Sequence, residues 1–154
     1  MLINIVPVGL PKDASIKELL NKYTNRIKPY TELRLLHVKP EPVTRQNSKV
    51  VLLKESKRIT DIMGFGYNIV FDSHGEMMDS DVFANFINKH IMTGTKTLNM
   101  IIGGPIGIDN GVKQKADRLL SLSKMTLPHE LALIMIVEQL YRAFAIINRL
   151  PYVK

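Results

Sequence analysis

The residues best suited to chemistry in this sequence are glycines and small polar residues that follow two short apolar runs. The run 98–102 breaks into Gly103-Gly104-Pro105-Ile106-Gly107, and the run 119–123 leads into a loop over 124–127 that ends at Pro128. Glycine has no Cβ, so its backbone can approach a ligand closely. Backbone groups at the carboxyl ends of strands are also free to bind a flat polar molecule. The pattern therefore predicts a small-molecule site, although Gly-Gly-Pro by itself is equally typical of a plain turn.

Other common kinds of site leave no signature here. The sequence contains neither Gly-x-Gly-x-x-Gly at a strand-to-helix junction nor the Gly-Lys-Ser/Thr of a phosphate loop. It has no cysteine, which excludes a disulfide framework and a thiolate metal site.

The elements that must position these loops alternate along the chain. The apolar patterns predict strands at 1–8, 31–38, 67–71, 98–102 and 119–123, and helices at 15–27, 49–63, 79–93 and 130–148. A polar, helix-like segment also follows the glycines at 103–107. A further loop is expected at 72–76, after the third strand. This alternation predicts one α/β domain over residues 1–154, with a parallel or mostly parallel sheet flanked by helices.

The last predicted helix is apolar in nearly every direction around its axis. Such a helix must be buried on more than one side, and one sheet can cover only one of its faces. We therefore expect the opposite face to meet a second subunit in a two-fold homodimer. Glu138 and Arg142 are polar exceptions, spaced to pair with each other.

The net charge of +7 is unevenly distributed. Residues 1–58 hold 12 Lys or Arg and 5 Asp or Glu, whereas residues 59–154 hold 9 of each. Lys54, Lys57 and Arg58 are spaced to share one helix face. Such a surface favours a nucleic-acid partner, with an ordinary solvated face as the alternative. No apolar run is long enough for a membrane span and no signal peptide pattern begins the chain, so we expect a cytoplasmic protein with no membrane partner.

Several strings together resemble one known family. IIGGPIG, LSLSKMTLPHE, IVEQLYRAF and a C-terminal Pro-Tyr are similar to the ribosomal RNA large subunit methyltransferase H family of the SPOUT superfamily. The likeness is ungapped over about residues 98–152 and continues more weakly through INIVPVG, LLKESKRI and IVFDSHGE. It therefore covers essentially the whole chain.

The resemblance implies a fold, a cofactor and a set of binding residues. Members of the family are homodimers with a C-terminal trefoil knot, which connection rules alone would not predict. They bind S-adenosyl-L-methionine within the knot through backbone groups. Carried across by motif, the cofactor-binding residues would be Phe71, Gly103, Gly104, Gly107, Ser123, Lys124, Met125, Thr126, Leu127 and Pro128.

The resemblance also implies a reaction, the methylation of N3 of a pseudouridine in large-subunit (23S) ribosomal RNA, on assembled ribosomes and without a metal. The main work of such an enzyme is to align the reactants and favour the deprotonated imide nitrogen. The candidate catalytic residues are Arg142, Tyr152 and His129. Arg142 could equally serve as a partner of Glu138, and His129 could serve local hydrogen bonding at a helix start.

Two positions depart from the family pattern. The chain ends Tyr152-Val153-Lys154, where the family has a histidine after the tyrosine, and Leu133 stands where the family tends to have an arginine. Both departures concern the substrate side, while the cofactor motifs are intact. Besides the family reaction, two alternatives stay open: a diverged methyltransferase with another RNA target, and a catalytically silent ribosome-binding dimer.

Overall fold

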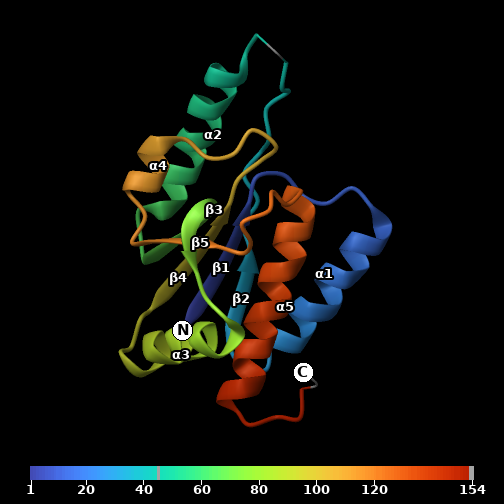
Figure 1. Cartoon of the computed structure of the whole chain (residues 1–154), viewed down its shortest axis with the longest axis vertical. Helices are drawn as coiled ribbons and strands as arrows, with labels where there is room; N and C mark the ends of the chain where they lie inside the picture. The colour runs from blue at the N-terminus through green and yellow to red at the C-terminus, as the bar shows by residue number, and fades with distance from the viewer. Residues whose placement is uncertain (45, 153–154) are drawn as a thin grey trace.

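The computed structural model describes residues 1–44 and 46–152; Val153, one of the two departures from the family pattern, lies outside them. Strands and helices alternate along the described chain, as predicted (Figure 1). In chain order they are β1 (Leu2–Pro7), α1 (Ala14–Ile27), β2 (Glu32–Leu35), α2 (Ser48–Met63), β3 (Tyr67–Met77), α3 (Ser80–Met92), β4 (Thr97–Ile102), α4 (Asn110–Gln114), β5 (Arg118–Ser121) and α5 (His129–Ile147).

The five strands form one sheet in the order β2-β1-β4-β3-β5, and every pair is parallel. The prediction of a parallel α/β fold is therefore confirmed. The register places Ile102 beside both Pro7 and Phe71, and Phe71 beside Leu120. The carboxyl ends of β1, β4 and β5 consequently meet the middle of β3 at one edge of the sheet, where the loops after β4 and β5 begin.

Helices cover both faces of the sheet, because side chains alternate along each strand. Ile5 and Met100 point into an apolar cluster with residues of α1, α3 and α5. Their neighbours Val6 and Ile101 point into a second cluster with Ile59 of α2 and residues of α4. Figure 1 shows α1 and α5 side by side, with α2 and α4 packed together away from them.

Buried asparagines link three central strands near their amino ends. Asn4, Asn99 and Asn68 are register partners on β1, β4 and β3. Asn4 donates to Asn99 over 2.8 Å, and Asn99 donates to Asn68 over 2.9 Å. Buried amides need such partners, so this ladder favours the observed register over a slipped one.

Helix α5 is covered more fully within one chain than the sequence argument assumed. It packs on the sheet and also contacts α1 and α3, with Tyr30 stacked on Phe144 at 5.6 Å between ring centroids. Two helices of the same chain therefore cover surface of α5 that the sheet leaves open, which the sequence argument did not consider. One stripe stays exposed: Leu131, Met135 and Ile146 have 49%, 38% and 39% of their surface accessible.

The largest difference from the predicted elements is at 72–76, predicted as a loop. The structure continues β3 to Met77 through an irregularity, because Leu120 of β5 pairs with Phe71 and again with Glu76. A Cβ on Gly75 would lie 2.5 Å from the backbone carbon of Leu120, so only glycine fits this crossing. The trefoil knot stays a prediction. No helix of the described residues is long and apolar enough to span a membrane.

Candidate functional site

A cavity of about 690 Å³ lies at the carboxyl edge of the sheet. Its walls come from three segments that are distant in sequence: the middle of β3, the glycine loop after β4, and the loop that joins β5 to α5. A smaller cavity of about 250 Å³ adjoins it and shares Phe71, Ser121 and Leu122. The size of the main cavity is within the usual range for small-molecule sites.

Nearly all of the residues predicted to bind a cofactor meet in this cavity. The lining includes Phe71, Gly103, Gly104, Gly107, Ser123, Met125, Thr126, Leu127 and Pro128, together with His129. Lys124 is the exception, because it is exposed and does not line the cavity. The structure thus gathers the predicted residues, while their contact with a cofactor stays a prediction.

The glycine loop is a tight turn whose glycines are sterically required. Gly107 donates its N–H to the carbonyl of Gly104 over 3.0 Å and has a φ of 82°. A Cβ on Gly103 would lie 2.6 Å from Cγ1 of Ile108. The lack of side chains at these glycines has two effects. It allows the tight turn, and it leaves the backbone of the turn on the cavity wall.

The buried carboxylate of Glu55, on α2, lies next to this loop. Glu55 is 3% exposed, and its Oε1 accepts the backbone N–H of Glu41 over 3.0 Å. Its Oε2 is buried without a hydrogen-bond partner among the described residues, and it lies 3.5 Å from where a Cβ on Gly104 would be. Val8 would be closer still, at 3.0 Å. Gly104 therefore has little room on its buried side.

The loop after β5 is held by hydroxyl groups. Ser121 donates its hydroxyl to the carbonyls of Ser73, on β3, and Ser123, over 3.3 and 2.9 Å. The hydroxyl of Ser123 accepts the N–H of Met125 over 2.9 Å. These bonds connect the loop to β3. They occupy few backbone N–H and C=O groups of the loop, so the others can bind a ligand in the cavity.

Asp72 is a cavity residue that sequence reasoning missed as a functional candidate. Its Oδ2 lies 2.5 Å from Nζ of Lys113, and its Oδ1 accepts the N–H of His74 over 3.0 Å. Partial burial alone would raise the pKa of Asp72, but the bonds from Lys113 and His74 outweigh burial and hold that pKa below its ordinary value. Its position directly after Phe71 was the signal that could have found it.

The three candidate catalytic residues do not meet within one chain. His129 lines the cavity at the start of α5. Arg142 and Tyr152 lie together near the other end, where both donate to Oε1 of Glu138, over 2.6 and 3.0 Å. At a rise of about 1.5 Å per residue, Arg142 is roughly 20 Å along the helix from His129. The predicted Glu138–Arg142 pair is confirmed.

Arg142 and Tyr152 both stay protonated near neutral pH. The hydrogen bond with Glu138 raises the pKa of Arg142, so its guanidinium stays charged. Burial, with hydrogen bonds to Tyr23 and Glu138, raises the pKa of Tyr152 well above its ordinary value. Tyr152 can therefore orient or donate a hydrogen bond, but it cannot act as a base near neutral pH.

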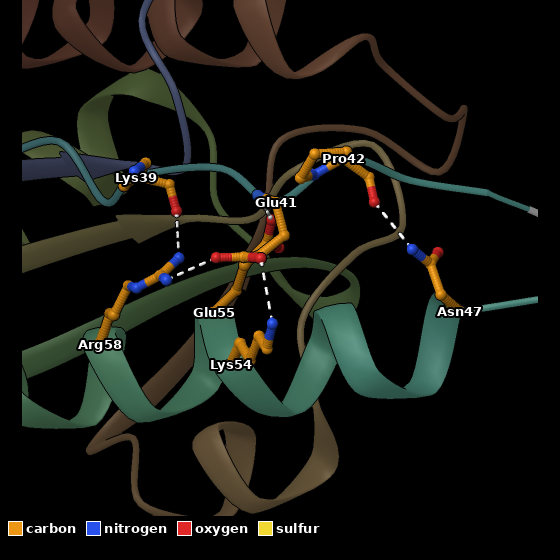
Figure 2. A network of polar contacts seen from close by, with 7 residues as sticks. All are labelled: Lys39, Glu41, Pro42, Asn47, Lys54, Glu55 and Arg58. Carbon is orange, nitrogen blue, oxygen red and sulfur yellow. Dashed lines mark hydrogen bonds and ion pairs between the residues drawn. The ribbon is translucent and has the colours of Figure 1, made fainter.

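The basic face of α2 contains a network of ion pairs and hydrogen bonds (Figure 2). Arg58 and Lys54 contact the carboxylate of Glu41 at 2.5 and 3.4 Å, and Arg58 also donates to the carbonyl of Lys39 over 2.7 Å. The predicted common face exists, but two of its three cations hold the segment 39–42 against α2. Lys57 is exposed on the same helix. Contact of this face with RNA stays a prediction.

No three His, Asp or Glu side chains of residues 1–44 and 46–152 gather as metal ligands would. The groups that the cavity offers are instead backbone amides and carbonyls, hydroxyls, one carboxylate and one imidazole.

Comparison with known proteins places the chain in a family. The family described as predicted SPOUT methyltransferase matches residues 1–152. Proteins named ribosomal RNA large subunit methyltransferase H match over the full length of both chains: the one from Syntrophobacter fumaroxidans is 39% identical over 157 residues, and the one from Malacoplasma penetrans is 35% identical over 158.

Solved structures agree on the fold. A probable methylase family protein from Haemophilus influenzae superposes with a TM-score of 0.62 at 13% identity, over 99% of this chain and 70% of that one. A probable methyltransferase from Bordetella pertussis gives 0.54 at 14% identity, over 92% and 95%. The matched family, the full-length relatives and the shared parallel fold lead to one conclusion: the chain belongs to the SPOUT methyltransferase family.

Proposed function

We propose that residues 1–154 act as one domain that transfers a methyl group from S-adenosyl-L-methionine to N3 of a pseudouridine in large-subunit ribosomal RNA, on assembled ribosomes in the cytoplasm. The observation that carries the proposal is the cavity formed by two backbone-rich loops at the carboxyl edge of the sheet. The full-length relatives named ribosomal RNA large subunit methyltransferase H support the RNA substrate.

The cavity fits this cofactor chemically. Phe71, Ile108 and Leu127 offer apolar surface for an adenine, while the glycine loop and the loop 123–128 offer backbone donors and acceptors. When bound, the cofactor supplies an electrophilic methyl group. The chain itself has to orient the two reactants and exclude water, and these tasks need rigid walls more than a covalent intermediate.

His129 and Arg142 are the candidates for the remaining chemistry. His129 is at the cavity rim, where its imidazole can accept a proton from the imide nitrogen or bind the base. The permanently charged Arg142 can stabilise negative charge on the base as the proton leaves. Within a single chain, however, only His129 is at the cavity.

A homodimer resolves this separation. Leu131, Met135 and Ile146 are exposed on the same stripe of α5 as Arg142, since all four are spaced at helical intervals. A two-fold contact along this stripe would cover its apolar residues and could run the two helices antiparallel. Arg142 and Tyr152 of the second copy would then approach the cavity of the first. The site would be complete only in the dimer.

The dimer makes a direct prediction about mass. Light scattering at micromolar concentration should give about twice the chain mass of 17.5 kDa. Replacing Met135 with lysine should shift the mass toward the monomer, because it would bury a charge in the contact. A wild-type protein that stays monomeric at this concentration would contradict the proposal.

The reaction itself is tested by transfer of radiolabelled methyl from S-adenosylmethionine to ribosomes, isolated large-subunit RNA and transfer RNA, followed by mapping of the labelled nucleotide. We expect label on ribosomes, at N3 of the pseudouridine. Label at another nucleotide would identify a methyltransferase with a different target. Absence of label with every RNA, despite measured cofactor binding, would favour the silent ribosome-binding dimer.

A further inference from the structure

The carboxylate of Asp72 is built into the cavity wall and has no role in the function described so far. It follows Phe71 on β3, and its side chain is only 13% exposed. Among the described residues that line the main cavity, Asp72 is the only carboxylate. A buried charge needs compensation, so its surroundings indicate what it can still bind.

Two neighbours hold this carboxylate in place. Nζ of Lys113, on α4, lies 2.5 Å from Oδ2, and Lys113 is itself mostly buried, with 23% of its side chain exposed. His74 approaches Oδ1 with its backbone N–H and with Nδ1, each at 3.0 Å. An ionised carboxylate has about four acceptor positions, two on each oxygen, and these three contacts leave one on Oδ2 of a residue that lines the cavity.

The charge of Lys113 decides which ligand group suits that position. The cofactor has four kinds of group that a carboxylate could bind: an α-ammonium, a sulfonium, the amino group of the adenine and the ribose hydroxyls. Because Lys113 already neutralises Asp72, a second cation there would be repelled at close range. A neutral donor, which is a ribose hydroxyl or the adenine amino group, can share the carboxylate with Lys113 without this cost. Of the two, a hydroxyl forms the shorter hydrogen bond to a carboxylate.

We propose that Asp72 accepts a hydrogen bond from a ribose hydroxyl of the cofactor's adenosine, with Lys113 as the positioning residue that fixes the carboxylate. This inference rests on the proposed use of S-adenosylmethionine. Carboxylates bind ribose hydroxyls in other nucleotide-binding folds, because an ionised carboxylate is a strong hydrogen-bond acceptor.

A role for Asp72 as the general base fits the site less well. The neighbours that hold its pKa below the ordinary value also make it a poor proton acceptor near neutral pH. The contacts with Lys113 and His74 also hold the side chain still, which suits the recognition of a hydroxyl at a fixed position.

The test compares two ligands with four proteins by calorimetry. The ligands are S-adenosylhomocysteine and its 2′,3′-dideoxy analogue. The proteins are the wild type, D72N, K113M and D61N, which makes the same chemical change at an exposed position of α2 outside the cavity lining. Melting curves without ligand verify that each variant is folded.

We expect D72N to weaken S-adenosylhomocysteine binding about ten- to a hundred-fold, the usual range for a lost charge-assisted hydrogen bond. The dideoxy analogue should bind wild type and D72N equally, within about three-fold. K113M should weaken S-adenosylhomocysteine by a smaller factor and the analogue hardly at all. D61N should match the wild type with both ligands.

Two results would overturn the inference: unchanged binding of S-adenosylhomocysteine to D72N, or an equal loss with both ligands, which would mean that Asp72 acts on another part of the molecule. If D72N does not fold, the wild-type protein alone provides the test. A difference of less than about three-fold between its affinities for the two ligands would refute the hydroxyl contact. If neither ligand binds the wild type, it is the proposed cofactor that fails.

Discussion

Replacing Gly104 with leucine is expected to reduce S-adenosylmethionine binding by more than about a hundred-fold, to below calorimetric detection. Even a Cβ at this position would lie 3.0 Å from Cγ1 of Val8 and 3.5 Å from the buried Oε2 of Glu55. A leucine cannot be accommodated on that side, so the loop must shift into the cavity that it lines.

The matched control is G64L. Gly64 has a φ of −58° and would place its Cβ no nearer than 3.8 Å to the carbonyl oxygen of Asp61, so leucine fits there without strain. G104A should have an intermediate effect, since its single added carbon requires a shift of only a few tenths of an ångström. Wild-type affinity in G104L would refute the placement of the cofactor against this loop.

Mixing two inactive variants is expected to restore methyl transfer. G104L lacks a working cavity, and R142A lacks the cation at the far end of α5, a loss that should lower kcat about a hundred- to a thousand-fold if Arg142 stabilises charge in the reaction. If each site combines the cavity of one chain with Arg142 of the other, each mixed dimer contains one intact site. Random exchange of subunits should then give about a quarter of the wild-type activity.

The control for this experiment mixes G104L with a Gly103→Leu variant. Both chains of that mixture have a damaged glycine loop, since a Cβ on Gly103 would lie 2.6 Å from Ile108, so no combination contains an intact cavity. Recovery with R142A and none with the control would establish a shared site. Failure of both mixtures, in dimers shown to exchange subunits, would place the complete site within one chain.

Much of the fold was predictable because its signals are local. The aspartates at 13 and 79 precede α1 and α3, and each caps its helix by accepting N–H groups within three residues. The apolar run that became β4 and the glycines after it were recognisable for the same reason: alternation, caps and turns depend on neighbouring residues.

The irregular part of β3 was not predictable in this way. Residues 72–76 are polar and contain a glycine, so they read as a loop, yet β3 continues to Met77 because Leu120 pairs with it twice. That pairing depends on β5, which is far along the chain. Strand pairing is a property of the sheet, and the sequence of one strand does not contain it.

The sequence by itself determined the α/β alternation, the two loops that line the cavity, and the apolar last helix. Only the tertiary structure decided that Asp72 meets Lys113, that Glu55 lies next to Gly104, and that His129 lines the cavity while Arg142 and Tyr152 meet at Glu138. The reason is physical. Local propensities depend on near neighbours, whereas the distance between functional groups depends on strand order, helix length and packing, which are set by contacts between remote segments.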